Sequence, residues 1–188
     1  PADDEALNFP LLILSGGVIA SLVTGIIAGR VGPRPLLVIY VSVFAVLGIY
    51  WSFAPAEFLV VPTLLAFFLA GYSKFGLVVV VNHYFLNISP GSDRVGNAML
   101  MRMVSGAVAG LIGAVIGGGI LGLLHALGFE GIDIYRNYFR VAAVALILAV
   151  LLVRRLDRLD EWPVRQAALL LLRPWRIVQM RREQTGRA

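Results

Sequence analysis

The chain contains no cysteine in 188 residues, which excludes a disulfide framework and any thiol chemistry. Charged residues make up only 14% of it, and fifteen of its sixteen basic residues are arginine, which leaves Lys74 as the one lysine. Its two histidines, His83 and His125, lie far apart and belong to no catalytic or phosphate-binding motif. We therefore expect the protein not to be an enzyme, and to hold no cofactor and no metal.

Apolar residues are in excess, at 59% of the chain, and the mean hydropathy is +0.86. Soluble domains are usually about 45–50% apolar. The excess falls in five nearly uncharged stretches, at about 9–29, 35–54, 58–87, 97–127 and 137–155. Because about 20 apolar residues in a helix cross the hydrocarbon core, this pattern predicts an all-α, polytopic membrane bundle of five transmembrane helices. A very apolar soluble helical bundle is the alternative, and five such stretches argue against it.

Summed over alternate loops, the basic residues favour one side of the membrane. Nine of the sixteen follow Val153, and the alternate loops carry twelve basic residues on one side against two on the other. Since lysine and arginine are enriched in cytoplasmic loops, we expect the N-terminus outside and the C-terminus in the cytoplasm of a multi-pass inner (cell) membrane protein. A net charge of +5 with this distribution indicates contact with the lipid bilayer and no nucleic acid.

Three parts follow from this layout: an extracytoplasmic lead-in (1–8), a membrane domain (9–156) and a cytoplasmic or interfacial basic tail (157–188). Within the tail, Trp162–Arg182 is predicted to form one or two amphipathic helices at the membrane surface, with a partly disordered tail as the alternative. The chain starts at Pro1 without a signal-peptide pattern, and we interpret it as compatible with an excerpt of a longer protein.

Small residues at helical spacing mark two of the predicted spans. They are Gly17, Ser21, Gly25 and Ala28 in the first span, and Gly106, Gly110, Gly113 and Gly117 in the fourth. Small residues let helix backbones approach closely in lipid, so these two spans are predicted to face protein. The second and fifth spans are bulky on all sides and are predicted to face lipid.

The loop between the first two spans reads GIIAGRVGPRPLL and carries a family resemblance. Its pattern is similar to the major facilitator superfamily signature G-x-x-x-D-R-x-G-x-R, matched at Gly25, Arg30, Gly32 and Arg34. Gly29 stands where the signature has its acid, so the resemblance does not extend to a gating salt bridge at that position. The stretches after the third and fourth spans resemble the entry to the family's glycine-rich eleventh helix and its twelfth helix. The chain from Phe9 to Leu156 thus resembles helices eight to twelve, most of the C-terminal half of a transporter.

This resemblance implies secondary-active transport of a small solute by alternating access. It implies that the third span lines a cavity and that the N-terminal half of the same transporter, absent from this chain, is the partner. The alternative is a non-transporting integral membrane subunit or assembly factor on the same scaffold. A wet cavity that reaches Lys74 would favour transport, whereas a lysine sealed by packed side chains would favour the alternative.

Lys74 lies near the middle of the third predicted span. It is about 25 Å along the helix from Glu57 and about 20 Å from Asn87, and half the hydrocarbon core is only about 15 Å thick. An ammonium at that depth costs about 2.5–3.5 kcal/mol, and none of the eleven acids lies within a predicted span. The expected partner is an anionic solute, and the alternative is a structural pairing with carbonyls or with the absent half.

The predicted substrate-binding set is built around this lysine. Gly71 and Val78 share its helix face, and Asn82 lies about 80° to the side. Arg102, in the fourth span, is the second cation expected at the inner mouth of the cavity, and the alternative is an arginine that reaches the headgroups or pairs with a helix cap.

Overall fold

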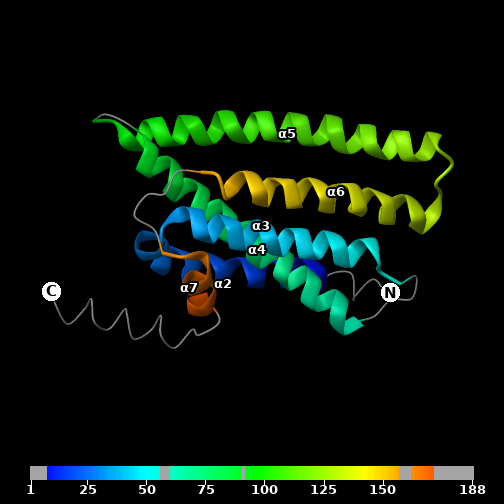
Figure 1. Cartoon of the computed structure of the whole chain (residues 1–188), viewed down its shortest axis with the longest axis horizontal. Helices are drawn as coiled ribbons and strands as arrows, with labels where there is room; N and C mark the ends of the chain where they lie inside the picture. The colour runs from blue at the N-terminus through cyan, green and yellow to red at the C-terminus, as the bar shows by residue number, and fades with distance from the viewer. Residues whose placement is uncertain (1–7, 56–59, 90–91, 157–161, 172–188) are drawn as a thin grey trace.

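A computed structural model describes residues 8–55, 60–89, 92–156 and 162–171 of the chain (Figure 1). These residues form no strand and six α-helices: α2 (Asn8–Val31), α3 (Pro33–Ser52), α4 (Val60–Ile88), α5 (Arg94–Ala126), α6 (Gly131–Val153) and α7 (Val164–Leu171). Five of them, α2 to α6, are long and apolar enough to cross a membrane. The prediction of an all-α fold with five candidate spans is confirmed.

The helix bounds lie close to the predicted ones except at α6, which begins six residues before the expected start at 137. The charged residues of this stretch indicated a loop, yet they stabilise the first turns of the helix. Arg136 Nη1 lies 3.3 Å from the Asp133 carboxylate, and the Asn137 side chain donates to the Asp133 carbonyl at 2.9 Å. Arg136 also donates to the Ala54 carbonyl, at 3.1 Å from Nε and 2.8 Å from Nη2, and so joins the start of α6 to the end of α3.

Two glycines make the short reversals between consecutive helices. Gly32 has a φ of 86° between the end of α2 and Pro33, the first residue of α3. Gly128 has a φ of 84°, and its N–H donates to the His125 carbonyl while the next N–H, of Phe129, donates to the Leu124 carbonyl. That pair of bonds is the Schellman motif, which requires the left-handed conformation that glycine adopts without strain.

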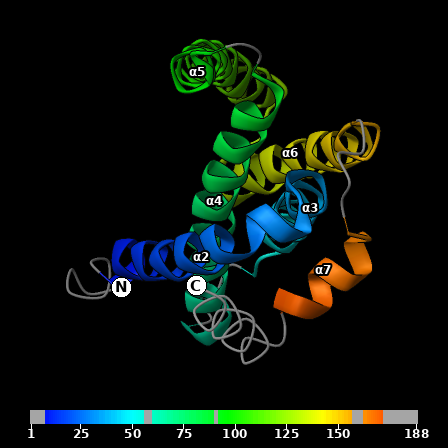
Figure 2. The same ribbon diagram turned by 90° about the vertical axis from the view of Figure 1, so that its left-hand side faces the viewer.

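The helices pack around α4, which crosses between α2 and α3 in the end view of Figure 2. α3 also packs along α6 and against α7, whereas α5 meets the rest of the bundle through its contacts with α4 and α6. Both views show α4 running away from α5 beyond the turn that joins them. α3 is the most enclosed of the five long helices, with half of its apolar window buried, and none of the corresponding window of α5 is buried.

Glycines allow α2 and α4 to come into backbone contact. A Cβ added at Gly71 of α4 would lie 2.0 Å from the Ile13 carbonyl oxygen, and one at Gly16 of α2 would lie 2.3 Å from the Phe68 carbonyl oxygen. Gly76 plays the same part toward α3, because a Cβ there would meet the Tyr40 ring at 2.4 Å. The closest helix contacts therefore depend on residues that lack a side chain.

The end of the bundle where α2 meets α3 is closed by α7. Ala167 and Leu170 of α7 are buried in the same apolar cluster as Val31, Leu36 and Tyr40. The Trp162 N–H, just before α7, donates at 3.1 Å to the Val31 carbonyl at the end of α2. α7 falls within the predicted amphipathic stretch. The rest of the predicted tail, 157–161 and 172–188, lies outside the described residues, as do residues 1–7 of the predicted lead-in.

The predicted faces of the helices are corrected in part. α3 was expected to face lipid, and this is wrong, because it is the most buried of the long helices. Gly17 and Ala28 of α2 are buried as expected, whereas Gly25 of the same stripe has no atom within 4 Å of an added Cβ. Gly106, Gly110 and Gly113 of α5 likewise have no described atom within 4 Å of an added Cβ.

Candidate functional site

Lys74 lies on the exposed side of α4. Its neighbour Ser73 is buried, and Gly76, which lies against Tyr40, is two residues further on and thus about 200° around the helix. No hydrogen bond or ion pair joins the Lys74 ammonium to any residue within the described ranges. The lysine therefore points away from α3, toward a side of α4 that these ranges leave uncovered.

The other residues predicted around Lys74 lie in different environments. Gly71 is buried in the contact with α2, where its Cα lies against the Ile13 backbone, so its place is that of a packing residue. Val78, one turn after Lys74, is half-buried. Of these two residues, only Val78 keeps solvent-accessible surface near Lys74.

Asn82 and Arg102 meet in a groove of about 330 Å³ between the end of α4 and the start of α5. Apolar side chains complete its lining: Leu86, Val95, Ala98 and Met99. Asn82 is exposed and Arg102 half-buried, so an amide and a guanidinium face one apolar hollow. Such a hollow can hold a small solute that carries one polar or anionic group.

Lys74 is not among the residues that line this groove. It precedes Asn82 by eight residues, which is about 12 Å along the helix axis. The structure thus brings together Asn82 and Arg102 from the predicted set and leaves Lys74 about two turns deeper along α4.

The loop motif lies at the end of the bundle that α7 closes. Gly25 is exposed, Arg30 is half-buried, and Gly32 makes the reversal between α2 and α3. Arg34 Nη2 donates to the Arg154 carbonyl, just beyond the end of α6. The last arginine of the motif therefore joins two helices that are 120 residues apart in the sequence.

Sequence reasoning missed a group of hydroxyls in the interior. The hydroxyls of Thr24 and Tyr40 are hydrogen-bonded between α2 and α3, and the Tyr72 ring of α4 lies 5.9 Å from the Tyr40 ring. Ser73 is fully buried, and its hydroxyl has no hydrogen-bond partner among the described residues. Polar residues in otherwise apolar spans were the available signal, because buried hydroxyls in a bilayer need a partner.

Within the described residues, no three histidine, cysteine, aspartate or glutamate side chains lie close enough together to hold a metal ion. No protein-family model, no curated protein and no solved structure matches the chain. The class of the protein is therefore assigned from its fold alone. With five helices long and apolar enough to span the bilayer, the fold is that of a multi-pass membrane protein.

Proposed function

We propose that the chain is most of the C-terminal half of a secondary-active transporter of a small, anionic solute, of the major facilitator type. The observation that carries the proposal is Lys74, a cation on the exposed side of a membrane-spanning helix with no counter-charge among the described residues. A charge at that depth is costly unless it meets water, an anion or carbonyls, and such residues commonly mark substrate pathways.

The uncovered surfaces of α4 and α5 support the same proposal. Lys74 is exposed on α4, and Gly106, Gly110 and Gly113 of α5 have no described atom within 4 Å of an added Cβ. Helix faces of small residues in lipid are suited to close packing on another helix. The proposed cover is the N-terminal half of the same transporter, so that Lys74 lies at the cavity between two rocking halves.

The groove at Asn82 and Arg102 is the proposed inner mouth of that cavity. It lies at the α4–α5 turn, about 12 Å along α4 from Lys74. An anion that enters there meets the Arg102 guanidinium first and the Lys74 ammonium second. Two cations in series attract an anionic solute without fixing it so tightly at one place that release becomes slow.

The test is uptake by the complete transporter in proteoliposomes. A panel of carboxylates and organic phosphates is first screened by thermal shift, and the best stabiliser is used as the labelled solute. Lys74→Ala should abolish its uptake at normal expression, and Lys74→Arg should restore it only in part, because a planar guanidinium does not replace a compact ammonium. Arg140→Gln, which removes an exposed cation beyond the proposed cavity, is the matched control and should transport normally.

Wild-type rate and affinity in Lys74→Leu would refute the site. The chain alone should show no saturable uptake, since half of the proposed cavity is missing.

Access of water to Lys74 separates the proposed transporter from a non-transporting subunit on this scaffold. In the complete transporter, with any cysteine of the other half replaced, a polar thiol reagent should modify Lys74→Cys, and protection of that thiol would favour the subunit.

A further inference from the structure

The groove at the α4–α5 turn is built from one face of each helix. Its described lining residues follow the three- and four-residue spacing of a helix face: Asn82 and Leu86 on α4, and Val95, Ala98, Met99 and Arg102 on α5. Ala98 is buried, whereas Val95 and Met99 remain exposed. The groove thus has uncovered apolar walls, and an amide and a guanidinium are its polar groups among the described residues.

The other charged side chains of this turn are bonded to the backbone. The Asp93 carboxylate accepts from the Gly96 N–H at 3.0 Å, and Arg94 donates to a carbonyl at the end of α4 at 3.1 Å. The residues of the turn outside the described ranges, 90–91, are proline and glycine and carry no charge. Arg102 is half-buried, and no hydrogen bond or ion pair joins its guanidinium to any described residue.

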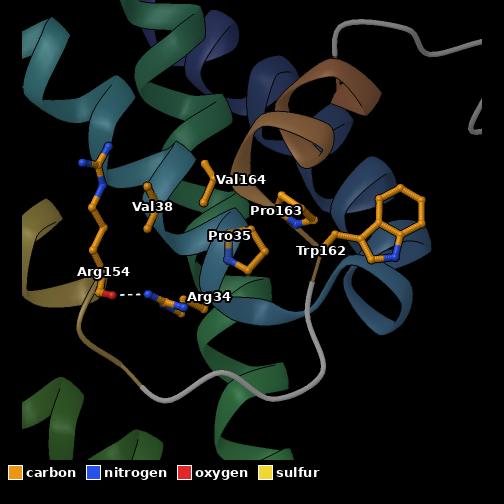
Figure 3. A pocket seen from close by; sticks show the side chains of 7 residues that line it. All are labelled: Arg34, Pro35, Val38, Arg154, Trp162, Pro163 and Val164. Carbon is orange, nitrogen blue, oxygen red and sulfur yellow. Dashed lines mark hydrogen bonds between the residues drawn. The ribbon is translucent and has the colours of Figure 1, made fainter.

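The use of arginine differs in a second hollow, of about 430 Å³, at the end of the bundle that α7 closes (Figure 3). There Arg34 donates to the Arg154 carbonyl and joins α3 to the residue after α6, so its guanidinium serves the packing of the protein itself. Arg102 makes no such bond. Because a half-buried cation without a partner is costly unless water or an anion meets it, the groove is the stronger candidate for an anionic ligand.

The charge in the groove matches a carboxylate. The planar fork of arginine donates two parallel N–H bonds to the two carboxylate oxygens, and an amide such as that of Asn82 can donate a further one. A phosphate monoester carries up to two negative charges, and Arg102 is the one cation among the described lining residues. The second charge would remain uncompensated beside apolar walls, so the charge balance favours a monoanion.

The walls and the volume define the rest of the ligand. One water takes up about 30 Å³ of liquid, so a groove of about 330 Å³ holds about ten water-sized groups. We propose that the groove binds a small monocarboxylate with an apolar body, its carboxylate on Arg102 and Asn82 and its body against the apolar walls. The assignment rests on the proposed transport function, for which it names the class of solute.

Protection of an introduced thiol tests the site in the full chain, which has no native cysteine. In detergent micelles, phenylacetate should slow the alkylation of Val95→Cys by N-ethylmaleimide in a saturable way, because Val95 lines the groove. Leu100→Cys is the matched control, since Leu100 is 62% exposed on α5, as Val95 is, and is not among the lining residues. Its alkylation should be unchanged, and equal slowing of both thiols would contradict binding in the groove.

Three related compounds test the ligand class in the unaltered groove lining. Phenylacetamide replaces the carboxylate by a neutral group of similar shape, acetate lacks the apolar body, and phenyl phosphate carries the larger charge. Each should need about tenfold more than phenylacetate for half-protection, or still higher concentrations, because a charge-assisted hydrogen bond or a buried ring is lost or a charge is left uncompensated. Equal protection by any of the three overturns the monocarboxylate.

Substitutions of the two polar residues test their roles. Arg102→Gln should raise the phenylacetate concentration for half-protection about tenfold or more. Asn82→Asp adds a carboxylate of the protein's own to the groove and should abolish protection. Arg155→Gln removes an exposed arginine just beyond α6 and outside the lining, and should leave protection unchanged. An equal loss in Arg102→Gln and Arg155→Gln would indicate a diffuse charge effect and overturn the site.

Membrane lipids share part of this ligand chemistry. Saturable protection by oleate or phosphatidylglycerol, with none by phenylacetate, would identify a lipid as the occupant and overturn the solute site. Failure of the proposed function has a different signature, because phenylacetate would then bind the groove but not be taken up by the complete transporter. Conversely, Lys74-dependent uptake of another anion, without protection by phenylacetate, would leave the proposed function standing and overturn the monocarboxylate.

Discussion

Single glycines decide how closely the helices around α4 approach one another. Where Gly71 faces Ile13 and Gly16 faces Phe68, α2 and α4 touch through their backbones, and no larger residue fits without moving a helix. A backbone carbonyl cannot swing aside as a flexible side chain can. The two positions are therefore more restrictive than their apolar surroundings suggest.

Gly71→Ala should destabilise the bundle by about 1–3 kcal/mol, because its Cβ would lie 2.0 Å from the Ile13 oxygen and force α2 from α4. Gly25→Ala is the matched control: it is the same substitution inside a helix, with nothing within 4 Å of the new Cβ. Since alanine favours the helix over glycine by about 1 kcal/mol at either position, the difference between the two isolates the clash. Unfolding in detergent micelles measures both, and equal stability of the two variants would contradict the contact.

Some residues of the candidate site could be predicted from the sequence, and the roles of others could not. Lys74 stands out by type and depth alone, because charge inside an apolar span is expensive wherever it points. The packing role of Gly71 depends on which helix lies opposite, and a helical wheel holds no such information. Asn82 was grouped with Lys74 by its position on the helix wheel and Arg102 as a second cation, whereas the groove that these two residues share lies about two turns along α4 from Lys74.

Among the elements, α7 is the shortest described helix and closes one end of the bundle. Ala167 and Leu170 face the cluster beneath α2 and α3, while Leu169 is 47% exposed on the other side. One face of an eight-residue helix therefore holds it in place, because isolated helices of this length are unstable in water.

Leu170→Asn should release α7 from the bundle, whereas Leu169→Asn should leave it docked. Burial of a leucine side chain contributes about 1.5–3 kcal/mol, so its loss raises the undocked population about tenfold or more. Brief trypsin digestion followed by mass spectrometry reports this as faster cleavage after Arg165 in the first variant only. Similar cleavage rates in both variants would show that Leu170 does not hold α7.

The existence of the elements was predictable, and their neighbours were not. Five apolar stretches predict five helices because a bilayer leaves the backbone little choice. Which face is buried is less accessible to sequence, since bulky apolar residues suit lipid and a neighbouring helix equally well. α3 was assigned to lipid on that ground and is the most buried of the long helices, while Gly106, Gly110 and Gly113 of α5 have no described atom within 4 Å of an added Cβ.

At the scale of the whole molecule, the loops sort by charge. The reversal at Gly32, the α4–α5 turn and the approach to α7 lie at one end of the bundle in Figure 1, and the α5–α6 turn lies at the other. The described arginines at the first end include Arg34, Arg94 and Arg154. This arrangement supports the proposed topology, in which that end is cytoplasmic.

Single-cysteine labelling tests the topology in intact cells, because the native chain has no cysteine to interfere. Glu130→Cys, in the exposed α5–α6 turn, should react with a membrane-impermeant maleimide. Ser92→Cys, exposed in the α4–α5 turn, should react only after permeabilisation. Labelling of Ser92→Cys in sealed cells would reverse the assignment.

The helices also differ in length more than a uniform bilayer accommodates. α3 has 20 residues and is about 30 Å long, which matches the hydrocarbon core, whereas α5 has 33 residues and is about 50 Å long. Hydrophobic mismatch of this size requires α5 to tilt or to project beyond the core. Arg102 lies about 12 Å from the start of α5, so a thicker bilayer draws its guanidinium toward hydrocarbon and a thinner one returns it to the headgroups. We therefore expect the acyl-chain length of the surrounding lipids to change the electrostatic potential within the groove that Arg102 shares with Asn82.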